Sequence, residues 1–122
     1  MMRVLGIGVD VVDTSRIAGM IDRHGERFLC RALTPNERAT LPKDPSLPIY
    51  AARRIAAKEA VMKALGMGLR PGSNWHTFEV EDVRPGWCVV HPRRRDLSEH
   101  HYHVALSRHG KMVVAMCTLE GE

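Results

Sequence analysis

The longest uninterrupted helix signal in this chain lies between Pro48 and Gly66. Residues 49–65 contain neither proline nor glycine and are rich in alanine, which has the highest helix propensity. Gly66 follows at once, as is common where a helix ends. One face of the predicted helix is mostly alanine and short aliphatic residues. This face should pack inward and let the backbone of a neighbouring strand come close.

The segments around this helix predict one strand before it and several after it. Residues 4–12 are mostly Val, Leu, Ile and Gly, as in a buried strand. Asp13, Thr14 or Ser15 can cap a helix that is bent or ended at Gly25. Thr34, followed by Pro35 and Glu37, predicts a second helix start. After the long helix, the strand-like segments are residues 75–83, 88–91, 102–107 and 112–119.

This order of a strand, then helices, then strands indicates an α+β fold, with the long helix packed on an antiparallel sheet. The 122 residues are enough for one domain, spanning 1–122, and 44% hydrophobic residues exclude a disordered chain. No apolar run approaches the ~20 residues of a membrane span. We therefore expect no membrane partner.

The cysteines indicate a reducing compartment. The three are widely spaced, with no C-x-x-C pair, so a disulfide framework or a zinc ribbon is not expected. Together with the absence of a signal-peptide core at the N-terminus, this predicts a cytoplasmic protein. All three cysteines are expected to be small core residues rather than nucleophiles. They are Cys30, Cys88 and Cys117. The net charge of +4 makes an acidic partner plausible.

Two carboxylates stand in apolar surroundings. Asp10 lies within the first strand, where burial is costly unless the charge is paired or bound to a cation. Glu59, together with Lys63, lies on the alanine-rich face of the long helix. Asp10 could instead cap a helix, and Glu59 with Lys63 could be a surface pair stabilising the helix by only ~0.2–0.5 kcal/mol. Two carboxylates and a lysine fit a magnesium–phosphate site better. Gly6 and Gly8 weaken the strand and suggest that something approaches its backbone closely.

Two motifs resemble a known family. Residues 6–13 (GIGVDVVD) and 52–68 (ARRIAAKEAVMKALGMG) are similar to the two motifs of the holo-(acyl-carrier-protein) synthases, which are small 4'-phosphopantetheinyl transferases. Residues 23–28, 33–38 and 103–107 also resemble segments of this family, in its order and at its usual length. The chain differs from the family pattern at three places. It has Ile55 for an aromatic residue, Met67 for a threonine, and Arg108, followed by His109, where a histidine is common.

The resemblance implies a concrete activity. The family transfers the phosphopantetheine arm of coenzyme A to a serine of apo-acyl carrier protein, with magnesium, and releases 3',5'-ADP in fatty acid biosynthesis. It also implies a homotrimer with active sites between subunits. By motif, Asp10 and Glu59 are the expected metal ligands, and Lys63 is expected near the transferred phosphate. These three residues are the catalytic candidates, and Glu59 or a metal-held water would take the serine proton.

The resemblance also suggests two sets of binding residues. The expected coenzyme A-binding residues are Arg54, Lys58, Lys63, Gly66, Gly68 and Ser107. An acidic carrier protein is expected to meet a basic side of the first helix. That side carries Arg16, Met20, Arg23 and Arg27.

Two other functions compete with this interpretation. A basic nucleic-acid-binding module would use the run 93–95 and the first helix; its binding would depend on salt but not on metal. It would leave Asp10 and Glu59 unexplained, so no nucleic-acid partner is expected. A non-catalytic relative that only binds carrier proteins is suggested by the altered Ser107–Arg108 step. His101 and His103 could share a metal, but the sequence offers no third ligand.

Overall fold

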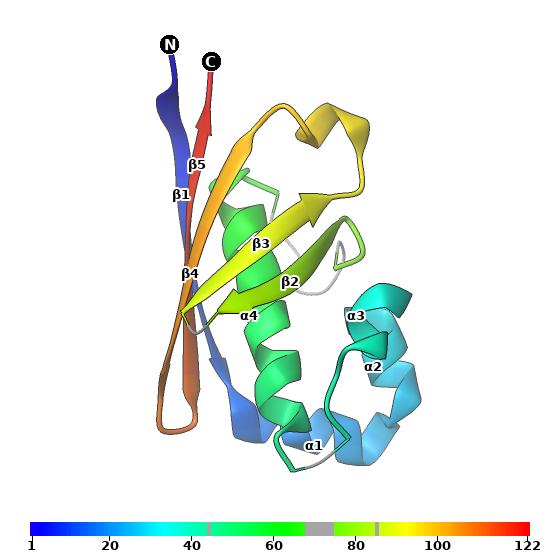
Figure 1. Ribbon diagram of the computed structural model, residues 1–122. Coiled ribbons are helices and arrows are strands. Elements are labelled where there is room, and N and C mark those ends of the chain that lie inside the picture. Colours follow the sequence, from blue (N-terminus) through cyan, green and yellow to red (C-terminus); the bar gives the residue numbers. More distant parts are fainter. Residues whose placement is uncertain (44, 68–74, 85) are drawn as a thin grey trace.

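The computed structural model describes residues 1–43, 45–67, 75–84 and 86–122 (Figure 1). Five antiparallel strands form one sheet in the order β1-β5-β4-β3-β2, so the chain has the predicted α+β fold. The elements are β1 (Arg3–Asp13), α1 (Thr14–His24), α2 (Glu26–Ala32), α3 (Pro35–Ala39), α4 (Leu47–Ala64), β2 (Phe78–Arg84), β3 (Trp87–Pro92), a 3-10 turn (Arg95–Leu97), β4 (His101–His109) and β5 (Met112–Gly121). Figure 1 shows α4 running alongside the sheet and the two chain ends side by side.

Helix α4 packs directly on the backbone of β1. A Cβ atom added to Gly8 would lie 2.0 Å from the carbonyl oxygen of Ala60, and one added to Gly6 would lie 2.1 Å from that of Ala64. Any side chain at either glycine would therefore force strand and helix apart. The close approach predicted from the two glycines is thus confirmed, and the approaching group is α4 itself.

The two faces of the sheet differ in burial. Along β5, Val113, Ala115, Cys117 and Leu119 are buried against α4 and the core. The alternating residues Met112 and Met116 are exposed. On neighbouring β1 the outward side chains are also apolar and about half exposed. They are Ile7, Val9 and Val11.

Local signals place the helix ends where the sequence predicts them. The Asp13 side chain accepts a hydrogen bond from the backbone N–H of Ser15 and so caps α1. Gly25, at φ 53°, separates α1 from α2. Gly66, at φ 73°, follows the end of α4, and the Met67 N–H reaches back to the carbonyl of Met62 at 2.8 Å. This Schellman-type end satisfies the last carbonyls of α4.

Some predicted boundaries are wrong. Trp75 does not begin a strand, since β2 starts at Phe78, and α4 starts at Leu47, two residues before the predicted helix. Cys30 is exposed rather than part of the core. Cys88 and Cys117 are buried as predicted, and burial raises their thiol pKa values to about 12 and about 11. Such thiols are poor nucleophiles at neutral pH.

Candidate functional site

The contact between β1 and α4 brings Asp10 and Lys63 together. The Lys63 ammonium donates to Asp10 Oδ1 at 2.8 Å and to the carbonyl oxygen of Val9 at 3.0 Å. The Lys63 side chain is 45% exposed and that of Asp10 16% exposed, so the pair is open to solvent on one side. Because Gly8 allows α4 to touch the strand, a lysine on α4 can reach a carboxylate only two residues further along β1.

Glu59 lies on the same side of α4 as Lys63. Residues four positions apart are neighbours on a helix surface, so the two side chains share one face, next to β1. Glu59 is only 7% exposed, and its Oε1 accepts a hydrogen bond from the Trp75 indole N–H at 2.7 Å. The structure thus joins Lys63 and Asp10 directly and places Glu59 one helical turn before Lys63 on α4. Trp75 was not predicted; the only signal was an indole just after a glycine-rich segment in a chain poor in aromatic residues.

The donor set at this contact suits magnesium. Among the described residues, no three His, Cys, Asp or Glu side chains gather as a metal-binding cluster. Magnesium is usually held by one or two carboxylates and completes its shell with substrate phosphate oxygens and water. Asp10 and Glu59 fit that requirement, because both offer hard carboxylate oxygens from facing elements.

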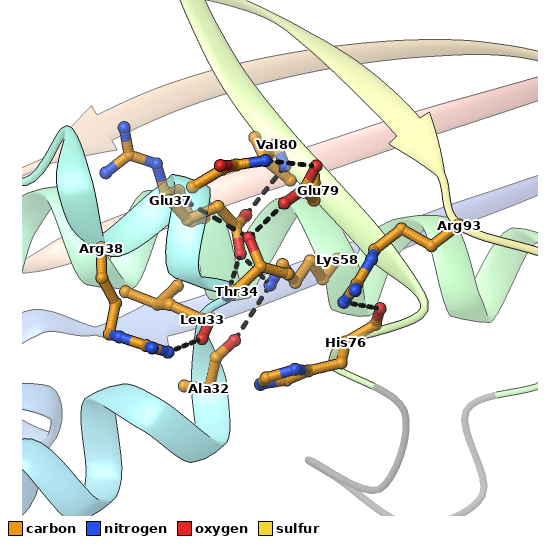
Figure 2. A network of polar contacts seen from close by, with 12 residues as sticks. Ala32, Leu33, Thr34, Glu37, Arg38, Lys58, His76, Glu79, Val80 and Arg93 are labelled. Carbon is orange, nitrogen blue, oxygen red and sulfur yellow. Dashed lines mark hydrogen bonds and ion pairs between the residues drawn. The ribbon is translucent and has the colours of Figure 1, made fainter.

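Lys58 lies in a different environment from Lys63, and its burial contradicts the prediction that it binds coenzyme A. Its side chain is fully buried, and its ammonium donates to Glu37 Oε1 at 2.5 Å and to the Ala32 carbonyl at 2.9 Å (Figure 2). Burial lowers the pKa of Lys58, although the Glu37 carboxylate opposes that shift. A ligand arriving from solvent cannot reach this ammonium without breaking the buried pair.

Glu37 is the centre of the polar network around Lys58 (Figure 2). Besides the ammonium of Lys58, it accepts the backbone N–H groups of Thr34 and Val80, both at 2.8 Å. The Thr34 hydroxyl donates in turn to Glu79 at 2.6 Å, and this hydrogen bond lowers the pKa of Glu79. The network therefore joins α3, α4 and β2 and satisfies groups that would otherwise be buried without partners.

Arg54 is not brought to the Asp10–Lys63 contact. It lies nine residues before Lys63, about two and a half helical turns, and therefore on the opposite side of α4. Its guanidinium is 4% exposed, donates to Thr40 Oγ1 at 3.1 Å and lies 3.6 Å from the Asp82 carboxylate. It lines a cavity of about 350 Å³ whose wall is otherwise rich in carboxylates. Its expected role in coenzyme A binding stays a prediction.

The other expected coenzyme A-binding residues are scattered. Gly66 ends α4, and Gly68 lies outside the described residues. Ser107 is exposed on β4, and its hydroxyl lies 2.9 Å from Nε2 of His109. Because side chains alternate along a strand, His109 shares the face of Ser107 and Arg108 takes the opposite one.

The predicted carrier-protein surface is split between two helices. Three of its residues lie on α1 and one on α2, because the first helix ends at Gly25. The arginines are exposed, and the half-buried Met20 accepts a hydrogen bond from Arg23 through its sulfur at 3.4 Å. The surface consists of Arg16, Met20, Arg23 and Arg27.

The features behind the competing functions have partners within the chain. Nε2 of His103 lies 2.7 Å from Glu120 Oε1 at the surface, so this ring nitrogen has a partner within the chain. In the basic run, Arg94 pairs with Asp96 at 2.7 Å, and Arg93 donates to the carbonyl of His76. Neither feature strengthens the metal or the nucleic-acid interpretation. Within the described residues, no helix is long and apolar enough to cross a membrane.

Comparison with known proteins gives a consistent result. Residues 6–117 match the model of the 4'-phosphopantetheinyl transferase superfamily. A holo-(acyl-carrier-protein) synthase of Solidesulfovibrio magneticus is 40% identical over 97% of this chain and 99% of its own length. A crystal structure of the Bacillus anthracis holo-(acyl-carrier-protein) synthase in complex with CoA (3',5'-ADP) is 32% identical, has a TM-score of 0.82 and covers all of both chains. The Neisseria meningitidis synthase is 26% identical with a TM-score of 0.82, over 96% of this chain and 98% of its own.

Proposed function

This chain belongs to the 4'-phosphopantetheinyl transferase superfamily, and we propose that its catalytic centre is the contact between β1 and α4. The reaction is transfer of the 4'-phosphopantetheine arm of coenzyme A to a serine of apo-acyl carrier protein. The products are holo-acyl carrier protein and 3',5'-ADP. The observation that carries the assignment of the centre is the Lys63–Asp10 contact beside the buried Glu59.

In the proposed reaction, the serine oxygen attacks the phosphorus that carries pantetheine. A new oxygen–phosphorus bond forms, and the bond from that phosphorus to the bridging oxygen of the pyrophosphate breaks, so that 3',5'-ADP leaves with that oxygen. Glu59 accepts the proton of the serine hydroxyl. Such chemistry depends mainly on positioning and on neutralising charge.

Lys63 provides one neutralising charge from the protein. Its ammonium is held by Asp10 and the Val9 carbonyl, yet it is 45% exposed, so it can turn to a phosphate oxygen without leaving a buried charge behind. Asp10 and Glu59 would hold a magnesium ion, which when bound supplies further charge neutralisation at the pyrophosphate. Their hard oxygen donors support this assignment.

A homotrimer with active sites between subunits is part of the proposal. Its support is the outer face of the sheet, where large apolar side chains are exposed, because exposed apolar patches usually mark interaction sites. These side chains include Ile7, Val9, Val11, Trp87, Val89 and Met116. The carrier protein would dock on the basic α1–α2 surface. A cytoplasmic location and a place in fatty acid biosynthesis are proposed with it, in agreement with three free cysteines.

One incubation tests the proposed function. Purified protein is mixed with magnesium, coenzyme A and an apo-acyl carrier protein, and the carrier is weighed by mass spectrometry. We expect the carrier to gain one phosphopantetheine group, and no gain with a carrier whose acceptor serine is replaced by alanine. Asp10→Ala and Glu59→Ala should each remove most of the activity while keeping the circular dichroism spectrum. Near-normal turnover in either variant would refute the assigned centre.

A further inference from the structure

A hydrogen bond joins Trp75 to Glu59, and the proposed function gives Trp75 no role. Trp75 precedes β2, while Glu59 lies in the C-terminal half of α4. The indole N–H is 2.7 Å from Glu59 Oε1, within the range of a charge-assisted bond. An indole nitrogen can only donate and a carboxylate can only accept, so the direction of this bond is unambiguous.

The indole is itself held in place by α2. Its ring meets the ring of Phe28 edge to face, with centroids 6.3 Å apart and planes at 83°. Phe28 is only 5% exposed and belongs to the core beneath α1 and α2. Phe28 therefore fixes the plane of the Trp75 ring, and that plane sets the direction of the N–H toward Glu59.

The backbone of α4 alone cannot fix the carboxylate of a glutamate, whose side chain rotates about three bonds. Groups that bind a metal or move a proton need a partner that locks their orientation, and such outer partners often decide metal affinity. Lys63, on the next turn, directs its ammonium to Asp10 and Val9.

We propose that Trp75 is a positioning residue, which fixes the orientation of the Glu59 carboxylate through this hydrogen bond and so prepares it for the divalent cation and the acceptor serine. This inference rests on the proposed function, because it assumes that Glu59 is the working carboxylate. It adds a residue outside the two sequence motifs to the machinery of the site. It also gives the Phe28–Trp75 ring pair a role beyond packing.

The first test is Trp75→Phe, which keeps an aromatic ring beside Phe28 and removes the N–H donor together with the pyrrole ring that carries it. Loss of an outer partner commonly weakens metal affinity or activity by about 10- to 100-fold. We expect the magnesium concentration for half-maximal activity to rise about tenfold, with the KM for carrier protein unchanged. The control is Tyr102→Phe, which also removes a hydrogen-bond donor carried by an aromatic ring, here the hydroxyl that donates to the carbonyl of Leu97, and which should leave the magnesium dependence unaltered.

The second test observes the bond without using activity. The chain has two tryptophans, so a nitrogen-15 spectrum contains two indole N–H signals, which Trp87→Phe assigns. We expect Glu59→Gln to move the Trp75 signal and not the Trp87 signal. Titration with magnesium chloride should also move only the Trp75 signal.

The two tests separate the possible failures. If the carrier protein is never modified but Glu59→Gln and magnesium still move the Trp75 signal, the proposed function fails and the positioning of Glu59 stands. If Trp75→Phe keeps the wild-type magnesium dependence, or Glu59→Gln leaves the Trp75 signal unmoved, the positioning role is overturned. Should Trp75→Phe fail to fold, the spectra of the wild type and Glu59→Gln decide alone.

Discussion

Helix α4 carries two lysine–carboxylate pairs that differ in almost everything except their chemistry. Lys58 and Glu37 lie 2.5 Å apart with side chains 0% and 2% exposed (Figure 2). Lys63 and Asp10 lie 2.8 Å apart with side chains 45% and 16% exposed. The two lysines are five positions apart and therefore leave α4 on different sides.

The difference shows why one pair is structural and the other suits catalysis. Removing one partner of a buried pair leaves an uncompensated charge, which is strongly destabilising, whereas a partly exposed pair can part at small cost because water replaces the contact. A lysine that must meet an incoming phosphate has to belong to the second kind. Both lysines lie within the second sequence motif, yet the structure makes only Lys63 available to a ligand.

Lys58→Met should have the largest effect in this comparison. It leaves the carboxylate of Glu37 buried without its cation, which we expect to lower the free energy of unfolding by about 3–5 kcal/mol. Urea denaturation measures the change. Lys63→Met is the matched control and should lower it by no more than about 1 kcal/mol.

Replacing both partners of the buried pair separates charge from packing. In Lys58→Met combined with Glu37→Gln neither member of the pair keeps a charge, so the loss should be smaller than the sum of the two single losses. Equal effects of Lys58→Met and Lys63→Met would remove the distinction between the pairs.

Lys63→Ala should have the next largest effect, and on rate rather than stability. Loss of one preorganised charge at a reacting phosphate commonly costs about a hundredfold in turnover. Turnover is measured with saturating coenzyme A and carrier protein, alongside the unfolding midpoint. Lys111→Ala, in the exposed turn before β5, is the control and should keep wild-type turnover. A variant that mainly unfolds would make Lys63 structural like Lys58.

The smallest effect is expected on the α1–α2 surface, where the charges are exposed and far from buried pairs. Arg16→Glu with Arg23→Glu should raise the KM for carrier protein several-fold and leave the KM for coenzyme A nearly unchanged, because rim charges act mainly on association. The wild-type KM for carrier protein should also rise with salt, since salt screens exposed charges. The control is Arg94→Glu with Arg95→Glu. If only the control pair changes the KM, the carrier protein docks near residues 93–95.

The sequence was sufficient for the features that depend on near neighbours along the chain. One of the three predicted cap residues, Asp13, caps α1, and the predicted bend or end at Gly25 and the helix end near Gly66 are also present; all of these signals are local. Gly6 and Gly8 also predicted that another group approaches the backbone of the first strand, because glycine in a strand often marks such a close approach.

Features that depend on distant contacts could not be predicted in this way. The helical repeat shows that Lys58 and Lys63 lie on different sides of α4, but not which side α3 and β2 cover. The burial of Lys58 depends on Glu37, 21 residues earlier, and on the N–H of Val80. The Trp75–Glu59 bond likewise depends on how the chain returns to α4 after Gly66.

Binding of a divalent cation at the β1–α4 contact is the most direct test of this account. Mn²⁺ replaces Mg²⁺ and is titrated in the presence of coenzyme A, while electron paramagnetic resonance reports the free ion; a titration of coenzyme A alone is subtracted. We expect one site in the wild type, unchanged affinity in Arg94→Glu with Arg95→Glu, and affinity about tenfold or more weaker in Asp10→Asn and in Glu59→Gln. Wild-type affinity in both carboxylate variants would contradict the account.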